Sequence, residues 1–197
     1  MSKEGSPDHP VHELITKRWS PYAFSNRLIP ADDLRSIFEA ARWAASSFNE
    51  QPWRYIVTTR DNPEAFEKAL SCLMEGNQGW AKEVAALGFG CVSTNFARNN
   101  NPNRVAEHDL GAASGNLTFE ATNRGVDVHQ MGGIFPDRVK EVFGLPDGFE
   151  AVTGIALGYF DDSGAAPEDL QKRDSGERKR RPLAEYVFGT EWGTGAL

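Results

Sequence analysis

Two short polar segments near the start of the chain contain residue types suited to binding a nucleotide-like molecule. The first contains Arg18 and Ser20, within the sequence Arg18-Trp-Ser-Pro-Tyr-Ala-Phe24. A guanidinium forms paired hydrogen bonds with phosphate oxygens, and a serine hydroxyl can add another. The second, Ser46 to Trp53, offers Ser, Asn and Gln side chains beside a proline. Such side chains suit the edge of a flat heteroaromatic ring, so we expect a nucleotide-like cofactor.

The residues between these segments predict an amphipathic helix that begins near Pro30. Asp32 and Asp33 would lie in its first turn, where negative charge is favourable. One face at helical spacing is apolar and contains Leu34, Ile37, Phe38, Ala41 and Ala45. This helix would place the two polar segments at its opposite ends.

The rest of the chain predicts a mixture of strands and further helices. The expected strands are Trp53–Thr59, Val84–Val92, Val126–His129 and Glu150–Phe160. The expected helices run from Pro63 to about Glu75, over Asp109–Arg124 and over Pro136–Phe143, with Gly76–Gly79 as a break and a helical turn at Trp80. We expect an exposed loop over residues 96–104, a polar segment over 161–181 and an extended, packed tail over 182–188. Without strict strand–helix alternation, α+β is the predicted class.

Size and charge restrict the classes of function. The 197 residues predict one domain over residues 11–197, preceded by a flexible arm over 1–10. The net charge of −7 argues against a general nucleic-acid binder. No apolar run is long enough for a membrane span, and the first residues lack a signal-peptide core. Cys72 and Cys91 fit no metal or redox spacing, so a cytoplasmic protein is expected.

Taken together, the segments resemble the FMN-dependent nitroreductase family along nearly the whole chain. The matching segments, in order, are Arg18–Ser20, Ala40–Trp53, Gly76-Asn77, His108–Gly111, His129–Gly133 and Gly154–Tyr159. The resemblance implies a mostly antiparallel central sheet flanked by helices, in a homodimer with two FMN sites at the interface and exchanged C-terminal tails. It also implies ping-pong hydride transfer from NADH or NADPH, through flavin N5, to nitroaromatic, quinone or similar flat acceptors.

The resemblance also implies which residues hold the cofactor. They are Arg18, Trp19, Ser20 and Tyr22; Ser46, Ser47, Asn49 and Gln51; Asn77 and Trp80; Met131, Gly132 and Gly133; and Arg178 and Arg180. The early pair Arg18 and Ser20 would bind phosphate or ribityl oxygens, and the late basic pair would close over the phosphate. Lys179 and Arg181 remain substitutes for that late pair.

The resemblance also assigns roles at the flavin ring to the remaining residues. The segment from Ser46 to Gln51 would come from the partner chain. Asn77 would bond the pyrimidine side of the ring, and the backbone of Gly132 and Gly133 would approach N5 closely. No side chain is expected to be obligatory for the hydride step. Tyr22 and Trp80 depart from the pattern, because many members carry Arg or Lys at the first position and some carry Lys at the second.

Plainer interpretations stay open beside these expectations. The basic run from Lys172 to Arg181 could be a solvated loop, and a structural role for His129 is favoured over proton delivery. No Gly-x-Gly-x-x-Gly motif provides a separate nicotinamide site. The rival functions are another reaction on the same scaffold (enone or semialdehyde reduction, dehalogenation or flavin breakdown), a non-catalytic FMN-binding redox sensor, and an acidic interaction module without a cofactor.

Overall fold

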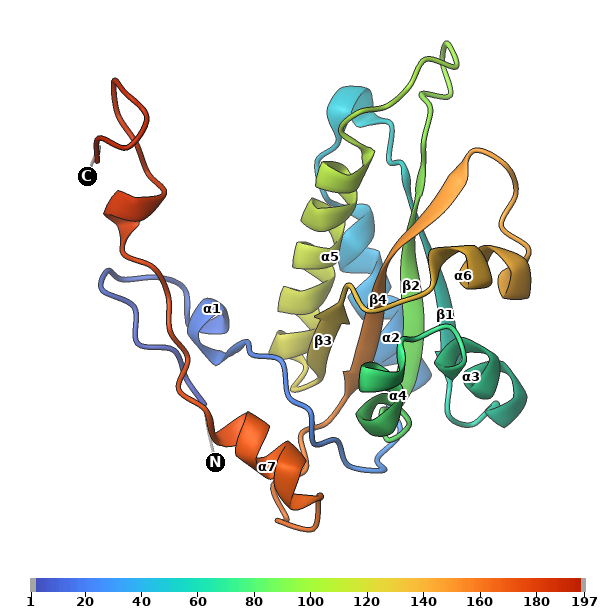
Figure 1. The fold of residues 1–197 in the computed structure, drawn as a ribbon, viewed down its shortest axis with the longest axis vertical. Helices are drawn as coiled ribbons and strands as arrows, with labels where there is room; N and C mark the ends of the chain where they lie inside the picture. The colour runs from blue at the N-terminus through green and yellow to red at the C-terminus, as the bar shows by residue number, and fades with distance from the viewer. Residues whose placement is uncertain (1–2, 196–197) are drawn as a thin grey trace.

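The computed structural model describes residues 3–195, which form a four-stranded antiparallel sheet surrounded by helices (Figure 1). The strands are β1 (Trp53–Thr59), β2 (Ala86–Ser93), β3 (Asp127–Met131) and β4 (Phe149–Gly158), in the spatial order β1-β2-β4-β3. Neighbouring strands are antiparallel throughout, with one register shift between Gly90 and Cys91. The predicted α+β class and antiparallel sheet are confirmed.

Each face of the sheet carries its own apolar core. Helices α2 (Ala31–Arg42) and α5 (Ala106–Asn123) cover one face, and α3 (Pro63–Leu70), α4 (Glu75–Ala81) and α6 (Pro136–Phe143) cover the other (Figure 1). In β2, Leu87 and Phe89 join the core under α3 and α6, whereas Ala86 and Val92 join the core under α2 and α5. This division follows from the two-residue period of a strand.

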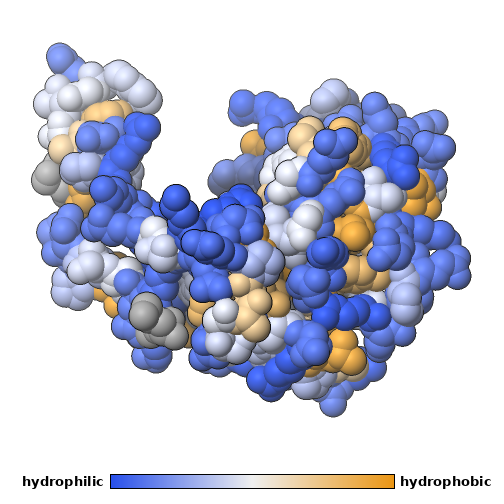
Figure 2. All heavy atoms as spheres, turned by 60° about the horizontal axis from the view of Figure 1, so that its bottom comes forward, coloured by the Kyte–Doolittle hydropathy of each residue, from blue (hydrophilic) through white to orange (hydrophobic). Residues whose placement is uncertain are grey.

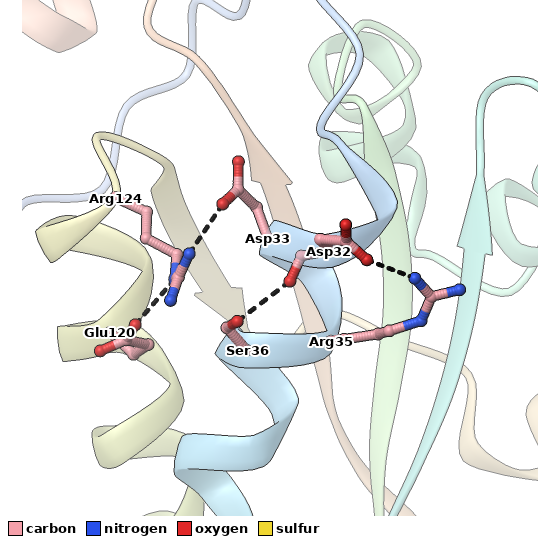
Figure 3. A network of polar contacts seen from close by, with 6 residues as sticks. All are labelled: Asp32, Asp33, Arg35, Ser36, Glu120 and Arg124. Atoms are coloured by element: carbon pink, nitrogen blue, oxygen red, sulfur yellow. Dashed lines mark hydrogen bonds and ion pairs between the residues drawn. The ribbon is translucent and has the colours of Figure 1, made fainter.

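An ion-pair network fixes α2 against α5 at the solvent side. Arg124, just after α5, donates to Asp33 of α2 at 2.8 Å and to Glu120 of α5 at 2.7 Å (Figure 3). Nearby, Asp32 pairs with Arg35 within α2. The network therefore helps to hold α2 and α5 together on their face of the sheet.

The predicted helix boundaries between residues 63 and 81 were wrong. The helix from Pro63 ends at Leu70, and the expected break over Gly76–Gly79 lies inside α4. The reason is tertiary pairing, because Leu73 forms an isolated bridge with Ile134 and the Met74 N–H donates to the Gly133 carbonyl at 2.9 Å. This pairing ends α3 early and brings α4 next to the segment that follows β3.

Two further helices were absent from the sequence prediction. They are α1 (Glu13–Lys17) and α7 (Glu168–Ser175), the second lying in the segment expected only to be polar. In α7 the buried residues are Leu170 and Asp174. The Asp174 carboxylate accepts hydrogen bonds from the Tyr22 and Ala23 N–H groups, at 2.8–3.1 Å. A buried acid that binds a distant backbone leaves no periodic signal in the sequence.

The C-terminal tail leaves the body of the molecule after α7. It passes beside α1 and includes one short helical turn, η2 (Leu183–Glu185). It ends in an arm that a deep notch separates from the body (Figures 1 and 2). At the tip Trp192 is 92% exposed, and its ring lies 4.8 Å from that of Phe188 at an angle of 53°. The tail predicted as extended over residues 182–188 contains the short turn Leu183–Glu185, and Tyr186 within it is 59% exposed in one chain. Among the described residues, no helix combines the length and apolarity that crossing a membrane requires.

Candidate functional site

Three arginines from the two ends of the chain come together beside α1. Arg18 follows α1 directly and donates to the Ser20 hydroxyl at 3.1 Å. Burial lowers the pKa of Arg18, and the nearby positive charges of Arg178 and Arg180 lower it further. The Arg178 guanidinium donates to the carbonyls of Lys3, at 2.9 Å, and Thr16, which fixes the tail to the N-terminal segment. The fold thus gathers like charges, an arrangement that favours an anion.

These arginines line a cleft of about 500 Å³ between the N-terminal segment, α1 and the tail. Arg181 also lines it, whereas Lys179 forms an exposed ion pair with Glu177 at 3.4 Å. Among the residues that the structure describes, no carboxylate forms an ion pair with Arg18, Arg178 or Arg180. Of the four basic residues 178–181, the structure therefore brings three to the cleft.

Tyr22 lies next to the arginine cluster, at the start of an aromatic group. Its ring meets His129 edge-on at 4.6 Å and Trp80 at 5.3 Å. On its other side, the guanidinium carbon of Arg173 lies 3.5 Å from the ring centroid. Trp19 faces a second cleft, where its ring packs edge-on against Phe160. Arg18 and its partner Ser20 therefore belong to the arginine cleft, Tyr22 belongs to the aromatic group, and Trp19 faces the second cleft, which Arg178 also lines.

His129 is held in this aromatic group by the backbone. Its Nδ1 lies 2.7 Å from the carbonyl oxygen of Pro21, so Nδ1 carries the proton and Nε2 is left as an acceptor. Burial lowers the pKa of His129, and the positive charges of Arg173 and Arg18 act in the same direction. The imidazole is therefore neutral at pH 7, which suits a packing role.

Asn77 and Gly133 form the polar part of the same region. The Asn77 amide donates to the Gly133 carbonyl at 3.0 Å and accepts from the Trp80 indole N–H at 3.3 Å. A Cβ at residue 133 would lie 2.4 Å from the Asn77 nitrogen, so any larger residue there would displace the Asn77 amide. A Cβ added at the neighbouring Gly132 would meet no described atom within 4 Å, so the backbone there is open to a ligand. Met131 and Trp80 are buried beneath this surface.

The segment from Ser46 to Gln51 lies elsewhere, at the end of the molecule where α5 begins (Figure 1). The Ser47 N–H donates at 3.0 Å to Asp109, in the first turn of α5. The arginine cleft instead contacts Phe119 of the same helix. Ten helical positions correspond to about 15 Å. One chain therefore does not bring this segment to the arginine cleft.

Sequence reasoning missed several residues that shape these groups. Arg173 and Asp174 lie on the unpredicted α7, and Asp109 was seen only as part of a matching segment. Asp109 is buried in the first turn of α5 and binds the distant Ser47 backbone, a contact that leaves no signal in the sequence. Among the described residues, no group of three or more His, Cys, Asp or Glu could hold a metal ion.

Comparison with known proteins decides the family. The sequence model described as "Nitroreductase family" matches residues 15–159. The chain belongs to the nitroreductase family. The resemblance stated from the sequence is thus confirmed, and so is the expectation of an oxidoreductase at the level of the family.

Solved structures agree with this assignment. A crystal structure described as "the oxidoreductase containing FMN" covers 99% of this chain and 98% of its own, with a TM-score of 0.89 and 37% identity. A nitroreductase family protein from Clostridium difficile 630 shares the fold, with a TM-score of 0.70 and 22% identity over 90% of this chain and 96% of that chain.

Curated relatives include proteins with and without an assigned activity. The "Uncharacterized 15.4 kDa protein in ask 5'region" of Mycolicibacterium smegmatis is 35% identical over 130 residues, covering 66% of this chain and 86% of that protein. The "Major NAD(P)H-flavin oxidoreductase" of Aliivibrio fischeri is 23% identical over 191 residues, covering 77% of this chain and 88% of that protein.

Proposed function

We propose that this nitroreductase-family protein binds FMN between two copies of the chain and oxidises NADH or NADPH to reduce flat electrophilic acceptors, such as nitroaromatics and quinones. The observation that carries the proposal is the gathering of Arg18, Arg178 and Arg180 beside an aromatic and amide-bearing surface. The names of the relatives, which mention FMN and NAD(P)H-flavin oxidoreductase activity, support it.

The arginine cleft fits the phosphate of FMN. A phosphate offers oxygens to several guanidiniums at once, and its negative charge offsets their mutual repulsion. Ser20, already within hydrogen-bond distance of Arg18, adds a hydroxyl at the same place. In this proposal Arg178 also orders the tail, because its guanidinium joins the N-terminal segment to the cleft.

The surface around Gly132 and Gly133 fits the flavin ring. Residues Arg18 and Tyr22 are four positions apart, so their Cα atoms lie at most about 14 Å from one another. One end of a nucleotide can thus meet Arg18 while its ring meets Tyr22, Asn77 and the open backbone at Gly132. The Asn77 amide uses one N–H on Gly133 and keeps another N–H for a ligand.

A second copy of the chain completes the site in this proposal. Ser46, Ser47, Asn49 and Gln51 lie about 15 Å along α5 from the region that binds phosphate, so they serve a cofactor held by the partner. Apolar side chains around the cleft are exposed in one chain, among them Val11 and Ile15, at 46% and 47%. Burying them against a partner would be favourable.

Bound FMN would supply the hydride chemistry at its N5 atom. The chain's own residues bind the phosphate, orient the ring and exclude water. In this proposal no side chain is obligatory for hydride transfer. The neutral His129 packs edge-on against the Tyr22 ring and does not deliver a proton.

The test is the visible absorbance spectrum of the protein purified with FMN and followed without oxygen during addition of NADH and then NADPH. Bleaching of the flavin bands by either nucleotide is the expected result. A bound flavin that stays oxidised would favour a non-catalytic FMN-binding sensor. Protein that excludes added FMN would contradict the proposal. Oligomeric state is measured in the same preparation by light scattering, with a dimer expected.

A further inference from the structure

An exposed aromatic ring, a half-buried one and an arginine meet at the end of the molecule where α5 begins. Phe48, in the short turn η1 (Ser47–Asn49), is 72% exposed. The guanidinium carbon of Arg98 lies 3.8 Å from the centroid of the Phe48 ring and 5.3 Å from that of Phe96. The two rings meet edge-on, with centroids 6.1 Å apart. We call Phe48, Phe96 and Arg98 the aromatic–arginine clamp.

The backbone that presents the clamp is strained. Phe48, Asn49 and Gln51 have φ values of 54°, 56° and 49°, in the left-handed region that side chains disfavour. Strain of this kind persists where the surroundings hold it, and it often marks a functional site. Strain that exposes an apolar ring brings no gain in burial within one chain.

Three hydrogen bonds hold this strained turn in place. The Ser47 N–H donates to Asp109, and the Gln51 N–H donates to the Ser46 hydroxyl, each at 3.0 Å. The Ala97 N–H donates to Glu50 at 2.6 Å, which joins the turn to the loop that carries Phe96 and Arg98. The clamp is therefore built from two loops that are fixed to one another.

The clamp carries one positive charge, that of Arg98, which can bind an anion. Arg98 is exposed, and among the residues described by the structure no carboxylate forms an ion pair with it. A guanidinium stacked on a ring still presents its edge N–H groups to a carboxylate. Arg98 thus presents a positive charge beside the exposed Phe48 ring, in a chain whose net charge is −7.

We propose that the aromatic–arginine clamp selects planar electron acceptors that carry a negative charge, such as a carboxylate on an aromatic ring. This inference rests on the proposed function, in which Ser47 and Asn49 reach the flavin of the partner. Phe48 lies between these two residues in sequence, so its ring borders the place where an acceptor stacks. The rings select a flat molecule, and Arg98 selects its charge.

The experiment compares two acceptors with one ring and different charge, 4-nitrobenzoate and 4-nitrobenzyl alcohol. With the FMN-loaded protein, the ratio of kcat/KM for the anionic to the neutral acceptor is expected to fall about tenfold in Arg98→Gln. Arg98→Lys, which keeps the charge, is expected to restore part of the ratio. Arg104→Gln is the matched control, because Arg104 is an exposed arginine of the same loop that contacts neither ring.

Three kinetic results would overturn the proposal, two of them in the ratio for the two acceptors. One is an unchanged ratio in Arg98→Gln. The other is an equal fall in Arg98→Gln and Arg104→Gln, which would show only a long-range effect of net charge. An effect confined to the KM for NADH or NADPH would also contradict it, since the bound anion would then be the donor.

A binding measurement separates this proposal from the function on which it rests. The dissociation constant of 4-nitrobenzoate is measured by calorimetry with oxidised protein and no nicotinamide. Weakening of about tenfold in Arg98→Gln, with no change in Arg104→Gln, would support the clamp even if NADH and NADPH failed to reduce the flavin. That failure would contradict the proposed function alone. Equal affinity in wild type and Arg98→Gln would overturn the clamp, whatever the flavin does.

Discussion

The Arg173 guanidinium carbon lies 3.5 Å from the centroid of the Tyr22 ring. The neighbouring residue of α7, Asp174, accepts a hydrogen bond from the Tyr22 backbone N–H at 2.9 Å. Consecutive residues of one helix thus hold both the ring and the backbone of Tyr22. From the sequence, Tyr22 stands at a position where many members of the family carry Arg or Lys, so the flavin site was expected to lack that cation. The structure places another cation directly over this tyrosine.

We expect Arg173→Gln to lower the reduction potential of bound flavin. Reduced flavin carries negative charge, and a nearby cation stabilises that form. One largely exposed charge is worth about 0.5–1 kcal/mol, which is roughly 10–20 mV for a two-electron couple. The measurement is an anaerobic potentiometric titration, with Lys172→Gln on the same helix as control. A potential that rises, or an equal shift in both variants, would remove Arg173 from the flavin environment.

Arg18→Ala should weaken FMN binding by about 1.5–3 kcal/mol, the value of a hydrogen bond to a charged group. The dissociation constant is measured by flavin fluorescence on titration of apoprotein. Arg35→Ala serves as the control, because Arg35 is an exposed residue of α2 whose ion-pair partner is Asp32. If Arg18→Ala and wild type bind FMN equally well, Arg18 does not hold the phosphate.

Asp109→Ala should destabilise the protein by about 1–3 kcal/mol, because it leaves the half-buried Ser47 N–H without its acceptor. Asp109 is 3% exposed, so water does not easily replace the carboxylate. Asp109→Asn keeps an acceptor oxygen and should recover most of the loss. The free energy of unfolding in urea is measured for both variants. Similar losses in both would show that the hydrogen bond to Ser47 is not the cause.

Asp127 should make stability depend on pH. Burial raises the pKa of its carboxyl group to about 6 from 3.8, although the Phe160 N–H that it accepts at 2.9 Å opposes this rise. Folding therefore favours the neutral form. The contribution of this group is full below about pH 4 and is lost as the pH rises through 6.

Asp127→Asn removes this ionisation and keeps an acceptor for Phe160. The unfolding free energy of the variant, minus that of wild type, should rise between pH 4 and pH 6 and then level off. His129, whose pKa is lowered by burial, contributes to both proteins and cancels in the difference. Urea unfolding at several pH values provides the measurement. A difference that stays constant from pH 4 to 7 would contradict the assignment.

Local patterns were sufficient for the elements that local physics controls. Trp53–Thr59 was predicted from its β-branched and aromatic residues, and it matches β1. The helix Pro136–Phe143 was bounded by a proline at its start and by Gly144, whose φ is 64°. In both cases the residues that define the element are contiguous, so the element can be recognised from the sequence alone.

The family and the α+β class could be predicted from the sequence alone, because both follow from residue types at short, ordered spacing, and the cofactor-binding residues stay a prediction from the same pattern. Only the tertiary structure decided that α3 ends at Leu70, where pairing with Ile134 outweighs helix propensity. It also decided that Arg173 lies over Tyr22 and that Arg98 lies over Phe48. Such contacts join segments that are distant along the chain, and their energy comes from packing and charge that no local pattern encodes.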